Sequence, residues 1–224
     1  MDMTPEEFEN VVKRLHQEAQ ERNLTYVFPK GRIFNVEEAF DDDYSYAKIN
    51  IKNGKRNIVF IGLNPARNGS PLAVYKKRAK AKEPLEKIVA NGSAWNRALN
   101  HSERLEDFNE LGSIYFLDIC ATGTLQASDL KQVQAESYMK SIEFISKYIS
   151  KYLSNSKIVL CPGGKANSKK IRKALYEKII KENKDRIYIY GLLLRGAPRH
   201  IIGSKGTDLS LIKDDQISKV SGIK

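Results

Sequence analysis

The sequence is poor in cysteine and histidine, and these scarcities exclude two classes of protein. It contains two cysteines, Cys120 and Cys161, and three widely spaced histidines among 224 residues. Two cysteines cannot form the disulfide framework of a small secreted domain, and they fit a reducing compartment. The histidines show no metal-ligand spacing. We therefore expect a cytoplasmic protein without a metal ion or any other cofactor.

Long apolar runs are also missing from the chain. No apolar stretch approaches the length of a membrane-spanning helix, and the acidic, polar N-terminus is unlike a secretory signal. The acidic run from Asp41 to Asp43 lacks further ligands at calcium-loop spacing, so we interpret it as a solvated loop. We expect no membrane partner.

Positive charge is what the chain has in excess. Its 38 lysines and arginines outnumber its 27 aspartates and glutamates, which gives a formal net charge of +11. This balance suits a polyanionic partner, either a nucleic acid or a nucleotide. The alternative is a proteome that decorates protein surfaces with lysine. Composition does not indicate the oligomeric state.

The N-terminal segment, residues 1–43, reads as a helix followed by extended pieces. Thr4 and Pro5 have the positions of a helix cap and a first helical residue, and apolar side chains recur at helical spacing as far as Arg22. The stretch from Tyr26 to Phe34, which Pro29 and Gly31 interrupt, indicates short extended pieces. We expect this segment to pack on the main domain, residues 44–203.

Within the main domain, apolar strands alternate with helices, which predicts an α/β protein with a parallel sheet covered on both faces. The four strand predictions are Ile58–Gly62, Ile114–Ile119, Lys157–Cys161 and Arg186–Leu192. The alternating stretch Tyr44–Ile51 and the turn signal Asn53-Gly54 predict an antiparallel edge hairpin with the strand at Ile58. Residues 204–224 are predicted to be a polar, poorly ordered tail.

Each predicted strand ends in a chemically useful group. The ends are Asn64, Asp118, Gly163-Gly164 and Arg199-His200. Because the carboxyl ends of parallel strands share one sheet edge, these groups should converge there, where open α/β sheets bind ligands. Gly163 and Gly164 precede a helix, and this arrangement suits a phosphate or a polar base edge. His200 suits proton transfer or stabilisation of an anion, or else a structural role.

Other candidates are less specific. The basic stretch around Lys76, Lys77 and Arg78 indicates either a solvated helix face or a phosphate-tracking surface. Cys120 and Cys161 end two strands, but no activating partner can be assigned, which favours small buried residues over nucleophiles.

The order of these loops resembles the uracil-DNA glycosylase-like superfamily, and most closely its uncharacterised bacterial and phage branch, a domain of unknown function. The motifs that carry the resemblance are Gly62-Leu63-Asn64-Pro65, Leu117-Asp118-Ile119, Ile158–Lys169 and Gly196-Ala197-Pro198-Arg199-His200. The resemblance implies a three-layer α/β/α sandwich with a four-stranded, mainly parallel sheet. It also implies that Asn64 positions water and that His200 stabilises a departing base. A partner of this kind would be DNA in preference to RNA.

The chain also departs from that pattern, and the departures shape the predicted function. Asp118 stands where the uracil enzymes use an asparagine, and an ionised aspartate accepts hydrogen bonds but cannot donate one. We therefore predict a nucleic-acid-processing, DNA-repair-type protein, resembling a glycosylase, that is not uracil-specific. The alternative is a non-catalytic module for DNA, RNA or a nucleotide on the same fold, so enzymatic hydrolysis remains an open prediction.

The predicted site contains three groups of residues. Asn64, Asp118 and His200 would be catalytic. The expected base-pocket residues are Gly62, Leu63, Pro65, Arg67, Gly163, Gly164 and Arg199. The expected phosphate contacts are Lys76, Lys77, Arg78, Lys165, Lys169 and Lys170.

Overall fold

We analysed a computed structural model of the chain. It describes residues 3–41, 43–51, 54–63, 88–89, 94–120, 135–201 and 208–222, with the backbone alone for residues 88, 89, 165 and 167. The strands are β1 Leu24–Val27, β2 Ile33–Phe40, β3 Ser45–Asn50, β4 Arg56–Gly62, β5 Ile88–Val89, β6 Leu111–Asp118, β7 Lys157–Leu160, β8 Ile187–Ile189 and β9 Ser210–Leu211.

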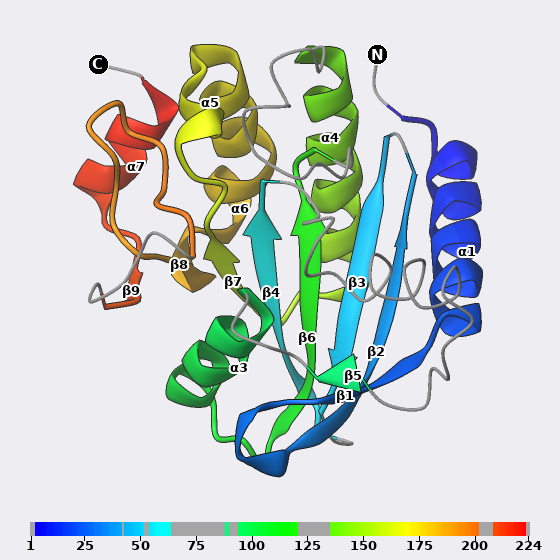
Figure 1. Cartoon of the computed structure of the whole chain (residues 1–224). Coiled ribbons are helices and arrows are strands. Elements are labelled where there is room, and N and C mark those ends of the chain that lie inside the picture. Colours follow the sequence, from blue (N-terminus) through cyan, green and yellow to red (C-terminus); the bar gives the residue numbers. More distant parts are fainter. Residues whose placement is uncertain are drawn as a thin grey trace.

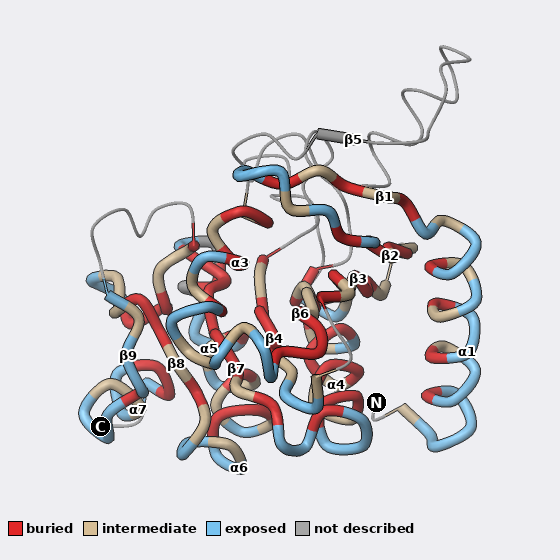
Figure 2. The backbone as a smooth tube through the Cα atoms, turned by 90° about the horizontal axis from the view of Figure 1, so that it is seen from below, coloured by how far each residue is buried: buried red, intermediate tan, exposed pale blue. Residues whose placement is uncertain are grey.

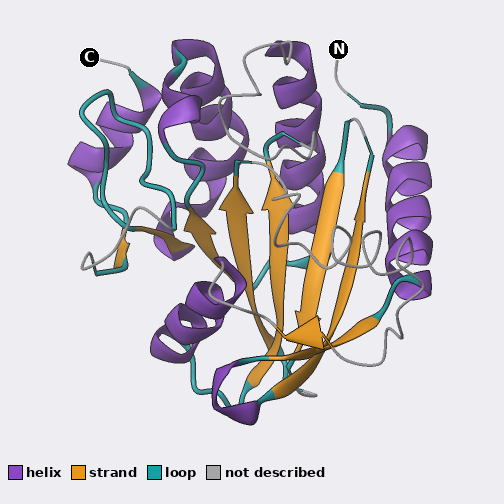
Figure 3. Cartoon of the chain, viewed as in Figure 1, coloured by secondary structure: helices purple, strands orange, loops and turns teal. Residues whose placement is uncertain are grey.

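The helices are α1 Pro5–Glu21, α3 Ala94–Leu105, α4 Ala135–Tyr152, α5 Lys169–Leu175, α6 Lys181–Asn183 and α7 Asp214–Ser221. Short 3-10 turns are η1 Pro29–Gly31, η3 Gly164–Asn167 and η5 Lys184–Arg186, and η4 Tyr176–Ile180 is a π-helical turn. Figures 1 and 3 show the helices arranged around one twisted sheet. Among the described residues, none of these helices has the length and apolar character needed to cross a membrane.

The α/β class is confirmed, but the expected four-stranded, mainly parallel sheet is wrong. The described strands form one nine-stranded mixed sheet in the order β5-β1-β2-β3-β6-β4-β7-β8-β9. The four predicted strands form its parallel centre, β6-β4-β7-β8. Antiparallel pairing adds β2 and β3 on one side and β9 on the other. The sheet is larger because the N-terminal segment joins it.

The interruption at Pro29 and Gly31 hid those N-terminal strands in the sequence. It proves to be a tight turn, η1, in which Lys30 has a φ of 65°. The chain then reverses, so that β1 and β2 pair antiparallel. The interruption at Pro29 and Gly31 is therefore the turn of a β-hairpin.

The predicted edge hairpin between residues 44–51 and the strand at Ile58 is also wrong. β3 pairs with β2 and β6, and β6 separates it from β4. Gly54 serves a different purpose, because a Cβ atom there would lie 2.2 Å from the carbonyl oxygen of Glu110. The glycine lets the chain pass tightly against the start of β6. The buried run in β4 instead takes parallel neighbours on both sides.

Two apolar clusters pack against the two faces of the sheet. Val59 and Ile61 of β4 belong to the cluster that α1, α4, α5 and α7 cover. Ile58 and Phe60 belong to the opposite cluster, which contains Trp95 of α3 and residues of β1 and β2. Figure 2 shows buried residues along the central strands and on the inner side of α1. This alternation buries β4 on both faces, as a central strand requires.

Three further segments can be compared with the sequence predictions: the first helix, the C-terminal residues and the helix after Gly164. The predicted N-terminal helix is confirmed, and Thr4 and Glu7 form a capping box at its start. The predicted disordered tail is wrong for residues 208–222, because they form β9 and α7, and Val220 is fully buried. The helix expected after Gly163 and Gly164 is instead divided among η3, α5, η4 and α6.

Candidate functional site

The ends of the central parallel strands meet at one edge of the sheet, as the sequence predicts. Gly62 of β4 is in register with Asp118 of β6, and Ile61 is in register with Leu160 of β7. The arrowheads of β4, β6 and β7 point the same way in Figure 3. Gly62, Asp118 and the residues that follow β7 therefore lie at one edge of the sheet.

Asp118 is the acidic group at this edge. A Cβ atom at Gly62 would lie 2.3 Å from Oδ1 of Asp118, so the carboxyl group occupies the space that the glycine leaves open. The backbone N–H of Asp118 donates to Oγ of Ser45 on β3 at 3.1 Å. The residue keeps some accessible surface, but protein surrounds its carboxyl group, and this burial raises its pKa from the ordinary range to about 7.

The protonation of Asp118 changes what the site can bind. Below neutral pH its carboxyl group is a neutral acid, which both donates and accepts a hydrogen bond. Above neutral pH it is a carboxylate, which only accepts. Near neutral pH, Asp118 is therefore present in both forms.

The last loop lies directly beside the end of β7. The backbone N–H of Gly163 donates to the carbonyl oxygen of Pro198 at 3.0 Å. A Cβ atom at Gly163 would lie 2.9 Å from Cβ of His200, so only glycine leaves room for the histidine. The backbone of Gly163 is therefore already engaged by the loop, while Gly164 is exposed at the start of η3.

His200 is held in its neutral form. It is partly buried, and this burial lowers its pKa below the ordinary histidine value. The positive charge of Arg97, on α3, lowers the pKa further. Nδ1 and Nε2 of a neutral imidazole supply one donor and one acceptor, which suits hydrogen bonding to a base or to a departing anion.

The cysteines are poor nucleophiles in this setting. Cys120 and Cys161 are both fully buried. Burial raises the pKa of the Cys161 thiol, and the charge of Asp118 raises it further. A thiol that stays protonated is a weak nucleophile. Both residues thus act as small packing groups behind the site.

The remaining predicted residues fall into three sets. Leu63 is buried, Arg199 is partly buried with its backbone N–H donating to Gly191, and Lys169 and Lys170 are exposed at the start of α5. The side chain of Lys165 lies outside the described residues. So do the six residues Asn64, Pro65, Arg67, Lys76, Lys77 and Arg78.

Sequence reasoning missed Arg97. One of its guanidinium N–H groups donates to the carbonyl oxygen of Ile201 at 3.1 Å, which ties α3 to the last loop. The residue lies more than 100 positions before that loop, so no local pattern connects the two. The only signal available in the sequence was the helical stretch around Trp95 that carries Arg97.

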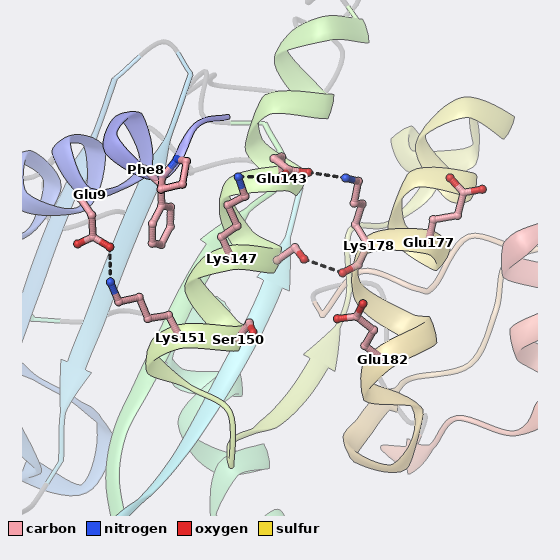
Figure 4. Close-up of a pocket in the computed structure, with 11 residues that line it drawn as sticks. Phe8, Glu9, Glu143, Lys147, Ser150, Lys151, Glu177, Lys178 and Glu182 are labelled. Carbon is pink, nitrogen blue, oxygen red and sulfur yellow. Dashed lines mark hydrogen bonds and ion pairs between the residues drawn. The ribbon is translucent and has the colours of Figure 1, made fainter. Parts of the chain in front are cut away.

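A separate cavity lies between α1, α4 and the η4–α6 segment (Figure 4). It has a volume of about 480 Å³ and contains none of the predicted site residues. Glu143 pairs with Lys147 at 3.2 Å and with Lys178 at 2.8 Å, and Lys151 pairs with Glu9. We call this cavity the helical groove. Each of its three lysines is therefore paired with a glutamate of the same groove.

Among the described residues, no group of three histidine, cysteine or acidic side chains could hold a metal ion. Comparison with known proteins gave no match to a family model, to a curated protein or to a solved structure.

Proposed function

We propose that this chain processes nucleic acid and binds a flipped base at the carboxyl edge of its sheet. The observation that carries the proposal is the meeting of Gly62, Asp118, Gly163 and His200 at that edge. A base taken out of a duplex or single strand is read by hydrogen bonds to its Watson–Crick edge, and Asp118 is suited to that contact. The net charge of +11 supports a polyanionic substrate.

The proposed reaction is hydrolysis of the N-glycosidic bond. Asn64 would orient a water molecule toward the sugar carbon, where a C–O bond forms as the C–N bond breaks. The electron pair of the broken bond leaves with the base, and a proton from water neutralises it. His200, kept neutral by burial and by Arg97, would donate a hydrogen bond to the departing base.

The proposed substrate preference depends on Asp118. As a carboxylate it repels the O4 carbonyl of uracil and accepts from two neighbouring donors, such as N1–H and N2–H₂ of guanine. The proposal that uracil is not preferred therefore applies above neutral pH. Lys76, Lys77, Arg78, Lys165, Lys169 and Lys170 are the proposed phosphate contacts.

The decisive experiment measures base release from labelled oligonucleotides that contain uracil, hypoxanthine, xanthine or alkylated bases, in single and double strands. Wild type and Asn64→Ala should be compared at about pH 8, where Asp118 is mostly ionised. We expect release from at least one substrate other than uracil, and its loss in the variant. Efficient release of uracil under these conditions would refute the proposed preference.

The same experiment tests a second function. If the protein binds the oligonucleotides tightly and with strong salt dependence but releases no base, it is a non-catalytic binding module. An asparagine is a weaker water-activating group than an aspartate, and this feature of the first loop favours slow chemistry or binding alone.

A further inference from the structure

The last loop, residues 191–201, is a short hairpin that follows β8. Leu192 and Pro198 form an isolated antiparallel bridge between its two sides. Near the tip, the backbone N–H of Leu193 donates to the carbonyl oxygen of Ala197 at 2.8 Å. Backbone pairing therefore ties the tip of the loop to its base.

The tip of this hairpin meets α5 and α7 at one point. A guanidinium N–H of Arg172, on α5, donates to the carbonyl oxygen of Lys219, near the end of α7, at 2.9 Å. Gly196 lies against that hydrogen bond, because a Cβ atom there would be 2.4 Å from the carbonyl oxygen of Lys219 and 2.8 Å from Nη1 of Arg172. We call Arg172, Gly196 and Lys219 the α7 clamp. Figure 1 shows the loop, in orange, beside α7.

Physical chemistry explains why an arginine and a glycine occupy the α7 clamp. The final carbonyl groups of a helix have no partner within it, and they form the negative end of its dipole. Arg172 supplies both a donor and a positive charge to that end of α7. Gly196 has a φ of +88°, which favours glycine, and its missing side chain lets the loop reach the hydrogen bond.

The element that holds the tip is itself fixed to the core. The backbone N–H of Ile212, just before α7, donates to the carbonyl oxygen of Ile187 on β8 at 2.8 Å. Val220, near the end of α7, is fully buried in the apolar cluster on one face of the sheet. The α7 clamp therefore joins the last loop to an anchored helix.

The base of the hairpin leads directly to the candidate site. The backbone N–H of Gly163 donates to the carbonyl oxygen of Pro198 at 3.0 Å, and a Cβ atom at Gly163 would lie 2.9 Å from Cβ of His200. Arg97 donates to the carbonyl oxygen of Ile201 at 3.1 Å. The last loop is thus held at its tip by the α7 clamp and at its base by β7 and α3.

We propose that Arg172 is a positioning residue, which fixes the tip of the last loop on α7 and so holds His200 at the sheet edge. The inference rests on the proposed function for the task of His200, which is to donate a hydrogen bond to the departing base. The placement of His200 by the α7 clamp is a separate statement that can be tested without a substrate. When the clamp opens, the hairpin moves as a unit and His200 leaves Gly163.

The first test compares amide hydrogen exchange in wild type and Arg172→Gln by NMR. The N–H of Gly163 is protected by its bond to the last loop, whereas the N–H of Cys161 donates to Ile61 of β4 at 2.9 Å. Local opening of the loop exposes only the first amide, and global unfolding exposes both. Losing one hydrogen bond changes an equilibrium by up to about tenfold. Exchange at Gly163 should therefore become about tenfold faster relative to exchange at Cys161.

Arg186→Gln is the matched control for this variant. Arg186 also donates to backbone carbonyls at the end of a helix, those of Leu153 and Ser156 after α4, at 2.9 and 2.8 Å. It lies just before β8, whereas the last loop follows the other end of that strand. The control should not accelerate exchange at Gly163 relative to Cys161. Arg172→Lys keeps a charge and a donor, so it should restore part of the lost protection.

The second test displaces the tip of the loop with Gly196→Ala. The new methyl group would overlap the carbonyl oxygen of Lys219, so the loop has to shift in every molecule. His200 should become less buried and lie farther from Arg97, so its pKa should rise toward the ordinary histidine value when the ring protons are titrated by NMR. Base release should slow by about tenfold. Gly31→Ala, where φ is +70° but nothing lies within 4 Å, should change neither quantity.

The opposite results overturn the inference. Unchanged exchange at Gly163 in Arg172→Gln, or an equal acceleration at Cys161, means that Arg172 stabilises the whole fold and not the loop. An unchanged pKa of His200 in Gly196→Ala means that the tip does not set the position of the histidine. If exchange and titration change as expected but wild type releases no base, the proposed reaction fails alone and the positioning role of Arg172 stands.

Discussion

The ionisable groups of the helical groove and those of the carboxyl edge of the sheet have different surroundings. In the groove, Glu143 lies between Lys147 and Lys178, and each positive group has a negative partner. At the edge, burial alone keeps Asp118 from its ordinary ionisation, and His200 is kept neutral beside an arginine. The groove has a volume of about 480 Å³, and each of its three lysines is paired with a glutamate of the same groove.

Paired charges and buried groups with shifted pKa values have different consequences for stability. Paired, partly exposed charges add a little stability and require nothing further. Buried groups with shifted pKa values cost stability, and they concentrate at sites where a ligand or a reaction uses them. The shifted pKa values of Asp118 and His200 therefore favour the sheet edge as the candidate site, and five predictions test the comparison.

The largest expected effect is a gain in stability from Asp118→Asn. The folded-state pKa of about 7 exceeds the unfolded value of about 3.9, so wild type loses stability as the pH rises from about 4 to about 7. Asparagine does not ionise. The variant should be more stable above about pH 7, by up to about 4 kcal/mol. Urea unfolding at several pH values measures this, and a difference that does not vary with pH would contradict it.

The second effect is a loss of stability from Gly163→Ala. Gly163 has φ 74° and ψ −169°, a conformation that favours glycine, and the new Cβ would lie 2.9 Å from Cβ of His200. We expect a loss of about 3 kcal/mol, from backbone strain and overpacking together. Gly31→Ala is the control, because φ there is +70° but nothing lies within 4 Å. It should cost only about 1 kcal/mol, and equal losses would mean that contact with His200 is unimportant.

The third effect is a reversal of base preference with pH. Inosine offers a donor and an acceptor to a neutral Asp118, whereas guanosine adds a second donor that suits the carboxylate. Between about pH 5.5 and about pH 8, the ratio of guanosine to inosine affinity should rise about tenfold. NMR titration with the two nucleosides measures this ratio. In Asp118→Asn the ratio should stay constant, and a similar rise there would exclude Asp118 as the reader.

The fourth effect is a loss of stability, whereas the first is a gain, although both variants replace a carboxyl group with an amide. Glu143→Gln in the helical groove removes the partner of Lys147 and Lys178. We expect a loss of about 1 kcal/mol at low salt, and a smaller loss at high salt because ions screen the pairs. Thermal or urea unfolding measures it. A gain in stability would show that the groove is strained in the same way as the edge.

The smallest effect is on the ionisation of His101. Arg104→Gln removes one of the two charges that lower the pKa of His101. That pKa should therefore rise when the ring protons are titrated by NMR, because a nearby positive charge disfavours protonation of the ring. Lys181→Gln, which removes a positive charge from an exposed residue of α6, should leave the pKa unchanged. No rise in Arg104→Gln would mean that the charge of Arg104 does not act on His101.

Sequence reasoning located the polar ends of the central strands but not their surroundings. Asp118 and His200 were found because each follows an apolar run, and a strand end is a local property of the chain. Arg97 and Ser45 were missed because they reach the edge through contacts with residues more than 70 positions away. The prediction of an edge hairpin was wrong for a related reason. Gly54, which belongs to the turn signal before β4, instead lies against the backbone at the start of β6.

The sequence by itself determined the α/β alternation, the capped first helix and the identity of the groups that end each central strand, because these depend on neighbours a few residues away. Tertiary structure alone decided the strand order, the charge state of Asp118 and the placement of α3 beside the last loop. Pairing between distant strands and burial from several elements set these properties, and neither is written in any one stretch of the chain.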